Sequence, residues 1–399
     1  MNTARWNSTE MMMPAAASSI QQRSLIIGAL FAVLSVVGAF ISPDRFYAAY
    51  LLGFTLWVGL SLGCLALVML IHMTGGDWGQ AVRRILEAGA RTVPMMALFF
   101  IPTILGMRHL YVWAQPDKIA HDKHLQEITR TYLHPTWFVV RAVIYFAIWI
   151  VLSWLLNKWS AEQDDPPAKD TGHRFRVLSG PGLVLYAFTL AFAAIDWVMS
   201  LNPSWISTIY GLLFLAGECL SAVCFVVVVV AILHRYRPVS EFMKADYVHD
   251  YGKLMLTFIM VWAYFSFSQW LIIWAGNQPE EISWYLRRLH GGWQLIGLFL
   301  ALFHFAVPFA FLLSRPLKRN VAKLVYLAVF LMLMRYVDMF WYIEPTFHEA
   351  FAVSWLDIVV PIAIGGFWLA LFFRNLKQRP LLPLYDVHTF PVLEPAHHG

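Results

Sequence analysis

Ten stretches of mostly apolar residues follow one another along the chain, separated by shorter polar segments. A bilayer core about 30 Å thick needs about 20 helical residues, and each stretch is close to that length or longer. Backbone groups left unpaired in lipid are costly, so we interpret all ten as helices, including those that contain Pro94, Pro102 and Pro308. The predicted spans are 24–41, 46–72, 92–113, 136–156, 181–200, 206–234, 252–275, 291–314, 320–342 and 351–373.

These spans predict an all-α integral membrane protein with one membrane domain, residues 24–373. Residues 1–23 are a predicted N-terminal segment and residues 374–399 a predicted C-terminal tail. The loop 157–180 and the tail after Arg379 contain many polar residues and prolines, which are typical of loops. Both are therefore predicted to be surface segments, and neither is predicted to be a folded domain.

The composition supports the membrane assignment. Of the 399 residues, 59% are hydrophobic and only 13% are charged, whereas a soluble domain has about 25% charged residues. The formal net charge of +5 gives no argument for nucleic-acid binding, because the basic residues sit at the ends of spans. The three cysteines, Cys64, Cys219 and Cys224, lie in apolar runs without CxxC spacing, so we expect no disulfide framework, no metal site and no iron–sulfur cluster in this chain.

The distribution of Lys and Arg predicts the orientation of the spans. Of the 29 basic residues, 20 fall on the side of the two termini, six on the opposite side and three in or next to spans. Arg83, Arg84 and Arg91, for example, are predicted to lie in the loop after span 2. Positively charged loops stay in the cytoplasm, so both termini are predicted to be cytoplasmic.

Two matching segments suggest that the chain is built from two related halves. In segment 196–205 an acid closes an apolar run and a proline follows seven residues later, and segment 338–347 repeats this pattern. Spans 2 and 6 both end on a histidine, His72 and His234. A shift of four spans preserves the direction of each helix. The pattern therefore predicts a parallel repeat of two four-helix bundles, spans 2–5 and 6–9, with spans 1 and 10 at the periphery.

Charged residues inside several spans are costly enough to need a partner or a function. We predict that four polar residues transfer protons through the bundle: Asp196, Glu218, His304 and Asp338. Arg141 and Arg335 are predicted to tune these acids. The alternative is structural, with the arginines only neutralising nearby acids, Asp357 included, and holding helices together. For Glu218 we favour a function, because no basic residue except His304 is predicted at its depth.

Two groups of residues fit either a cofactor or ligand site or simple packing. His72 and His234 lie at matching ends of spans 2 and 6, which raises the alternative of a haem held at the membrane interface. There is no CxxCH motif, and only His304 lies well inside the membrane. A group of aromatic residues favours either helix packing or a pocket for a flat, lipid-soluble ring: Tyr264, Phe265, Phe267, Trp270 and Trp274.

Several longer motifs point to a known family. They are the Trp262–Glu281 run with its Ser268-Gln269, Trp274, Asn277 and Pro279-Glu280-Glu281, together with Asp196-Trp197 through Asn202-Pro203, His134-Pro135 through Arg141, and His304 through Pro308. In these motifs the chain resembles the ActF subunits of bacterial alternative complex III, which belong to the NrfD/PsrC-like superfamily of integral membrane proteins. The resemblance covers nearly the whole chain and is weakest at both ends.

The resemblance implies ten helices in two four-helix bundles and a place in a quinol:electron-acceptor oxidoreductase of the bacterial cytoplasmic (inner) membrane. It implies an iron–sulfur subunit and multihaem cytochrome c subunits as partners on the periplasmic side, holding the haem c and iron–sulfur cofactors. A paralogous, ActC-like membrane subunit is then the better candidate for the quinol site. This chain is expected to hold no redox centre and to support proton translocation, with quinone or menaquinone as the ligand of any pocket.

A different class of function fits some of the same features. Parallel repeats and buried acids also occur in stand-alone secondary transporters. Those proteins often carry short helices broken by Gly or Pro at matching places in the two halves, and no such pair is evident in this sequence. We therefore keep the transporter as the alternative.

Overall fold

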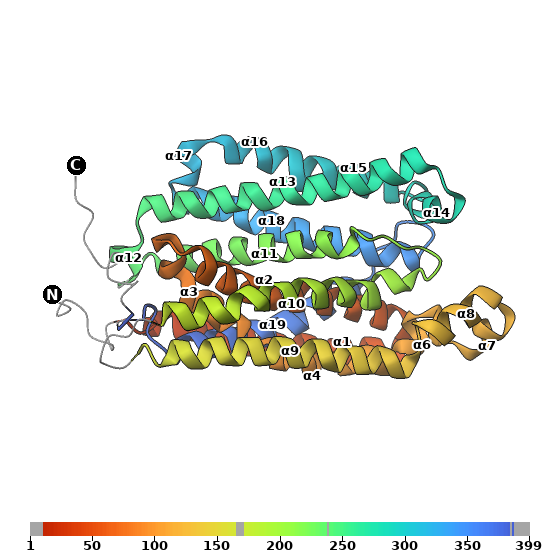
Figure 1. Ribbon diagram of the computed structural model, residues 1–399, viewed down its shortest axis with the longest axis horizontal. Helices are drawn as coiled ribbons and strands as arrows, with labels where there is room; N and C mark the ends of the chain where they lie inside the picture. Colours follow the sequence, from red (N-terminus) through yellow and green to blue (C-terminus); the bar gives the residue numbers. More distant parts are fainter. Residues whose placement is uncertain (1–10, 165–170, 238, 384, 387–399) are drawn as a thin grey trace.

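The computed structural model describes residues 11–164, 171–237, 239–383 and 385–386, which form helices and loops without a β-strand. Long helices lie side by side along the long axis of the molecule (Figure 1). The helices that make up the spans are α1 (Ala15–Ile41), α2 (Pro43–Thr74), α3 to α5 (Asp77–Ala90, Val93–Phe99 and Ile101–Leu105), α9 (Pro135–Ala161), α10 (Gly172–Trp197), α11 (Tyr210–Leu233), α13 (Ala245–Gly276), α15 and α16 (Trp293–Leu300 and Val307–Leu313), α18 (Val321–Ile343) and α19 (Trp355–Lys377).

Shorter helices connect the long ones. They are α6 (Met107–Leu110), α7 (Pro116–His121), α8 (Lys123–Thr131), α12 (Val239–Phe242), α14 (Pro279–Arg288) and α17 (Arg315–Lys318). Helices α7 and α8 project from one end of the bundle (Figure 1). One-turn 3₁₀ segments extend α10 and α18 at Met199–Leu201 and Glu344–Thr346.

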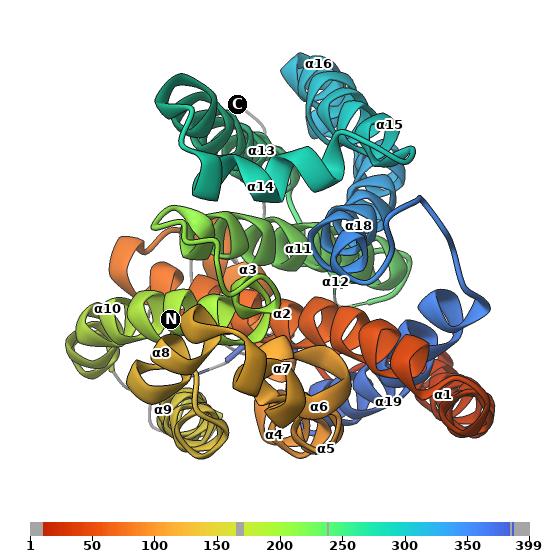
Figure 2. The ribbon, with the colours of Figure 1, turned by 90° about the vertical axis from the view of Figure 1, so that its right-hand side faces the viewer.

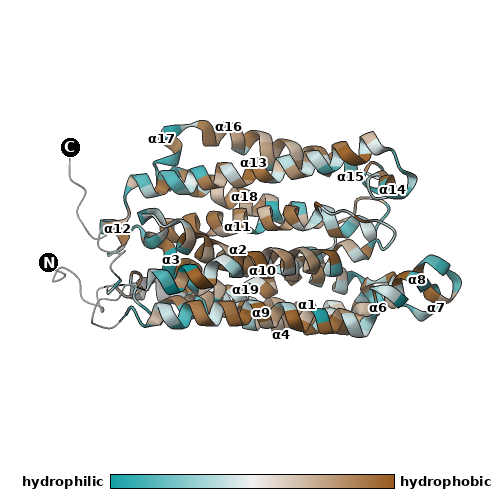
Figure 3. Ribbon diagram, viewed as in Figure 1, coloured by the Kyte–Doolittle hydropathy of each residue, from teal (hydrophilic) through white to brown (hydrophobic). Residues whose placement is uncertain are grey.

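The described part of the chain contains ten helices that are long and apolar enough to cross a membrane, which confirms the prediction of ten apolar spans. Their apolar residues lie along the middle of the bundle, and hydrophilic residues gather mainly near its two ends (Figure 3). An apolar middle of this kind suggests a multi-pass membrane protein. The parallel repeat and the cytoplasmic placement of the termini stay predictions.

Helices α2 and α11 pack against each other in the middle of the bundle (Figure 2), and most of their residues are buried. Two glycines on α2 make this close packing feasible. A Cβ at Gly63 would overlap the backbone carbonyl of Glu218 on α11, and a Cβ at Gly59 would lie 3.0 Å from the Cγ of Glu218. Small residues at helix crossings let backbones approach closely in membrane proteins.

Replacing Gly63 with alanine is expected to destabilise the protein by about 1–3 kcal/mol, because α2 and α11 must move apart. Gly180→Ala in α10 is the matched control, since the nearest atom to its new Cβ is 3.7 Å away. Alanine favours a helix over glycine by up to about 1 kcal/mol, so this control should be neutral or stabilising. Thermal unfolding in detergent measures both, and equal midpoints for the two variants would refute the close-packing argument.

The third span differs from its prediction, 92–113. Its helices run from Asp77 to Leu105, and Gly75 and Gly76 break the chain before it with positive φ angles of 70° and 100°. Arg83 and Arg84 therefore do not lie in a loop, and that prediction is wrong. Both are buried on α3, where Glu87 forms ion pairs with both guanidiniums. These ion pairs allow charged residues to be part of the span.

The predicted surface loop 157–180 is mostly not a loop. Helix α9 continues to Ala161 and α10 already begins at Gly172, so only a short connection is left, of which residues 165–170 lie outside the described residues. The connection is also tied to α3, because Gln163 is buried and accepts a hydrogen bond from Arg83. The prediction of a surface segment is wrong for these residues because polar partners far along the chain bury them.

The first residues of the C-terminal tail are also buried, contrary to the prediction. Leu381 and Leu382 are almost inaccessible, and Asp386 accepts a hydrogen bond of 2.9 Å from Arg83. The backbone N–H of Leu381 donates to the carbonyl of Met11 at 2.7 Å, which places both described ends of the chain at the same end of the bundle. We call this the terminal end. Residues 1–10 and 387–399 lie outside the described residues.

Helix α1 is at the periphery and packs mainly on α19, the last span (Figure 2). The contact is close at Gly28 and Gly366, where a Cβ on either glycine would meet backbone atoms of the other helix. Most large apolar side chains of α1, such as Phe40 and Ile26, are exposed in this chain. Helix α19 also packs on the central helix α2, where the indole of Trp57 donates to the carbonyl of Pro361 at 2.8 Å, so span 10 connects span 1 to the central helices.

Candidate functional site

Asp196 and Arg141 form an ion pair near the end opposite to the terminal end. Asp196 lies in the last turn of α10 and is fully buried. Its two oxygens accept hydrogen bonds from Nε and Nη2 of Arg141 on α9 at 2.8 and 2.9 Å, and Tyr145 donates a third at 2.9 Å. The guanidinium also lies over the ring of Tyr132, 4.1 Å from its centre. Bidentate pairs of this type hold both groups in one geometry.

A second acid–arginine pair lies in the other half of the chain, on one turn of α18. Arg335 donates to Oδ2 of Asp338, and the indole of Trp262 on α13 donates to the same oxygen at 3.1 Å. Both charged residues are buried. The other carboxylate oxygen, Oδ1, has no hydrogen-bond partner, so this acid has an open position for a proton donor.

His304 lies next to this pair, in a widened turn of the eighth span. Residues Ala301–Ala306 form a π-helical segment between α15 and α16. Pro308 explains the distortion, because it has no N–H to donate to the carbonyl of His304 and its ring would clash with that carbonyl in a regular helix. The imidazole is fully buried, its ring centre is 4.1 Å from that of Trp262, and neither ring nitrogen has a partner. Such π-segments are frequent at functional sites.

Glu218 lies between the two halves, on the central helix α11. Its carboxylate accepts a hydrogen bond of 3.0 Å from Tyr186 on α10. A void of about 10 Å³ beside it is lined by both Glu218 and Arg335, together with Thr55 and Ser221. This is close to the smallest volume that holds one water molecule. The expectation that only His304 lies at the depth of Glu218 is therefore wrong, because the guanidinium of Arg335 reaches the same void.

The six predicted site residues thus fall into two groups. Glu218, Arg335, Asp338 and His304 are brought together around the contact of α11, α13 and α18. Asp196 and Arg141 form the other group. On α10, Asp196 is seven residues from Thr189, about 10.5 Å along the axis, and Thr189 accepts a hydrogen bond of 2.8 Å from Trp149. Within the described residues, no chain of side-chain hydrogen bonds along this part of α10 connects Asp196 to Glu218.

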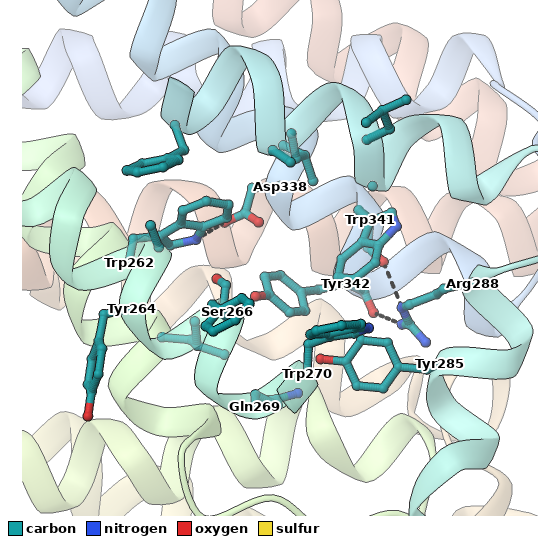
Figure 4. Close-up of a pocket in the computed structure, with 18 of the residues that line it drawn as sticks. Trp262, Tyr264, Ser266, Gln269, Trp270, Tyr285, Arg288, Asp338, Trp341 and Tyr342 are labelled. Carbon is teal, nitrogen blue, oxygen red and sulfur yellow. Dashed lines mark hydrogen bonds between the residues drawn. The ribbon is translucent and has the colours of Figure 1, made fainter. Parts of the chain in front are cut away.

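A cavity of about 710 Å³ lies beside the group that contains Asp338, between α13, α14, α15 and α18. Its wall is largely aromatic, with Trp262, Trp341 and Tyr342 among its residues (Figure 4). Asp338 faces into it from α18 and Arg288 from α14. A mostly apolar cavity of this size with a few polar groups is typical of a small-molecule site.

Several polar atoms in the cavity wall have no partner within the protein. They are the hydroxyl of Ser266, the indole nitrogen of Trp341 and the Oδ1 atom of Asp338. Buried polar groups are normally hydrogen-bonded, so each of these buried atoms has unused capacity for a hydrogen bond to a ligand group or a water molecule. They include donors and an acceptor, which fits a ring with oxygen substituents.

Some of the aromatic residues for which the sequence suggested a ring pocket line this cavity. Tyr264, Phe267 and Trp270 line the cavity, whereas Phe265 and Trp274 are not among its lining residues. Trp270 and Trp274 stack on each other with ring centres 5.7 Å apart, and Trp274 is mostly exposed. Because α13 is a helix, five aromatic residues within eleven positions cannot all face the same cavity.

Some residues of the site were missed from the sequence. Tyr186 and Tyr145 are ordinary aromatic residues within apolar runs, and only the fold shows that they bind Glu218 and Asp196. Glu344 is buried at the end of α18, with Oε1 unpartnered and Oε2 3.7 Å from Nε2 of His348. The sequence does show this acid directly before Pro345 in the second acid-to-proline segment, but its position at the end of a span gave no reason to expect that it is buried.

Two other polar residues that the sequence analysis singled out make local contacts. Asp357 accepts a hydrogen bond of 2.7 Å from the backbone N–H of Ser354 and so caps α19. His72 lies 3.2 Å from the Ser179 hydroxyl and stacks on Phe175. Within the described residues, no group of three or more His, Cys, Asp or Glu side chains is arranged to hold a metal ion.

Two comparisons of the sequence with known proteins found no match: no protein-family model matches the chain, and no curated protein is significantly similar to it.

Proposed function

We propose that this chain is the non-redox integral membrane subunit of a quinol:electron-acceptor oxidoreductase, of the ActF type found in bacterial alternative complex III. Its buried acids carry protons that move when quinol is oxidised. The observation that supports this most directly is the position of Asp338, which belongs both to the buried polar group and to the wall of the aromatic cavity. A ligand in the cavity can therefore exchange a proton with the interior of the bundle.

The cavity supports a quinone-type ligand. Its aromatic wall fits a flat ring, and the free atoms of Ser266, Trp341 and Asp338 fit the ring oxygens. Tyr264 and Phe267 on α13 and Leu298 on α15 line the cavity and are more than half exposed in this chain, so a lipid-soluble ligand can enter from the bilayer. Quinone or menaquinone is the ligand class that we propose.

The redox chemistry of the proposed complex belongs to partner subunits. Electrons from quinol would pass to an iron–sulfur subunit and multihaem cytochrome c subunits, and an ActC-like membrane subunit is the better place for quinol oxidation itself. In the proposed orientation both termini are cytoplasmic in the bacterial inner membrane. The cavity then lies nearer the periplasmic side, where these partners and the final acceptor would dock.

In this proposal, protons move by way of Glu218, Asp338 and His304. Glu218 and Arg335 share a void with room for one water, and Asp338 and His304 both contact Trp262. Arg335 holds the charge of the neighbouring acids within the low-dielectric interior. Asp196 and Arg141 would serve the first half of the bundle in the same way.

A stand-alone secondary transporter is the alternative. Transporters of this kind often have broken helices at matching places in the two halves, with half-helix ends directed at the substrate. Here the breaks occur in the third span, at the α4–α5 junction, and in the eighth span, at Ala301–Ala306. In the predicted repeat the third span corresponds to the seventh and the fourth to the eighth, so the breaks do not match.

Purification through a tag on this chain in mild detergent tests the proposal. We expect iron–sulfur and multihaem cytochrome c subunits to copurify, identified by mass spectrometry, with haem bands in the visible spectrum. A lone chain without a chromophore, under conditions that preserve other respiratory complexes, would contradict the proposal. Substrate uptake by that lone chain in liposomes would favour the transporter.

A further inference from the structure

Arg288 differs from the other buried arginines of the described chain. Arg83 and Arg84 form ion pairs with Glu87, and Arg335 pairs with Asp338. Arg288 is equally buried, with 1% of its surface exposed, but it forms no ion pair within the described residues. It lines the cavity from the last turn of α14.

The guanidinium of Arg288 is held in place by neutral groups. Each nitrogen donates to a backbone carbonyl. Nε donates to Trp341 at 3.1 Å and Nη2 to Tyr342 at 2.7 Å (Figure 4), and Nη1 donates to Trp284 at 3.0 Å. The ring of Trp284 stacks under it, with the ring centre 3.5 Å from Cζ. The terminal nitrogens carry further N–H groups beyond those used in these contacts.

A positive charge without a partner anion is costly in a buried position. Burial accordingly lowers the pKa of Arg288 to about 9, which still leaves it charged at neutral pH. Asp338 does not provide the missing charge, because it is already paired with Arg335. The cavity wall therefore carries a net positive charge on the side of α14, and a bound anion would gain a charge-assisted hydrogen bond there.

We propose that the cavity prefers lipid-soluble ring ligands that carry a negative charge on a ring oxygen, and that Arg288 binds this oxygen. An ionised hydroxyquinone, or quinol that has lost a proton, has this chemistry. The indole N–H of Trp341, whose carbonyl Arg288 holds, is free to donate to the same part of the ring. This inference rests on the proposed function, because it assumes that the cavity binds a ring of the quinone class.

The test compares two probes on the purified full chain or its complex. One is an alkyl-substituted hydroxynaphthoquinone, whose acidic hydroxyl is ionised at neutral pH. The other is its methyl ether, which has the same ring and tail without the charge. Quenching of tryptophan fluorescence reports binding, since Trp262, Trp270, Trp284 and Trp341 line the cavity. We expect the charged probe to bind at least about tenfold more tightly, as for one charge-assisted hydrogen bond.

Variants assign this preference to Arg288. Arg288→Gln should reduce the affinity of the charged probe to that of the ether, and Arg288→Lys should retain part of the difference. Arg287→Gln is the matched control, because Arg287 is the exposed neighbour, does not line the cavity and contacts Asn202 and Thr346 instead. The elution profile and helical content of each variant show whether α14 stays folded; the two probes on the unaltered chain test the preference without any substitution.

Three results would overturn the inference. The first is equal affinity of the two probes for the unaltered chain, and the second is a preference that survives Arg288→Gln. The third is displacement of the charged probe by dodecanoate, seen as recovery of tryptophan fluorescence, at concentrations similar to that of the probe, because the charge would then be recognised without the ring. Each of these can occur while redox subunits still copurify, so failure of this inference and failure of the proposed function are distinguishable.

Discussion

Replacing Glu218 with glutamine is expected to slow proton translocation by about a hundredfold, the effect typical of losing a positioned proton-transfer group. The substitution preserves the size of the side chain, and the amide oxygen can still accept the hydrogen bond of Tyr186. The amide cannot take up and release a proton at physiological pH. The measurement is the rate of proton translocation by the complex in sealed vesicles, taken together with the rate of electron transfer to give the ratio of protons moved to electrons transferred.

Two controls separate this role from packing. Glu280→Gln changes an exposed acid at the start of α14 and should leave the ratio unchanged. The haem content of the Glu218→Gln complex should equal that of the unaltered complex, which shows that assembly is intact. An unaltered ratio of protons to electrons in the Glu218→Gln complex would refute the role of this acid.

Replacing Arg335 with leucine is expected to destabilise the protein by about 3–5 kcal/mol, because the carboxylate of Asp338 would be left charged and buried. Only the indole N–H of Trp262 would then remain as its partner. The double variant Arg335→Leu/Asp338→Leu should recover much of this loss, since replacing a whole buried pair by apolar residues is often close to neutral. Unfolding curves in detergent measure both.

An exposed ion pair provides the comparison. Arg319 and Asp246 lie 2.5 Å apart with side chains 37% and 71% exposed. Arg319→Gln should cost no more than about 1 kcal/mol, as is usual for surface pairs. If Arg335→Leu were no more destabilising than Arg319→Gln, or if the double variant were as unstable as the single one, the pair would not have the role described.

The number and approximate place of the spans could be predicted because apolar length alone decides them. The exact ends of the spans could not be predicted where the residues at those ends are paired with residues distant in the sequence. Arg83 and Arg84 looked like loop residues, since nothing nearby shows that Asp164 and Asp386 reach them in the folded chain. The burial of Leu381 has the same origin, as its backbone partner is Met11.

The candidate site was predictable in part for a related reason. Acids within the apolar spans can be recognised in the sequence. An arginine three residues away on the same helix can be recognised as a partner, as in the pair of Arg335 and Asp338. The proximity of Glu218 to Arg335 depends on which sides of α11 and α18 face each other. The sequence does not show this, because apolar residues lie on nearly every side of both helices. The cavity between α13 and α15, and the charge of Arg288 in its wall, depend on tertiary packing and have no local signal in the sequence.

The pairing of α1 with α19 determines when the protein can finish folding. Ribosomes deliver α1 first and α19 last, and domains generally fold in the order of synthesis. The surface of α1 around Gly28, which packs closely against Gly366, therefore stays without this partner until the spans between them have been made. The contact between Met11 and Leu381 is then also a late event, because Leu381 follows α19 in the sequence. A chain truncated before α19 would leave α1 without its partner, so it would be recognisable to quality-control proteases by its first helix.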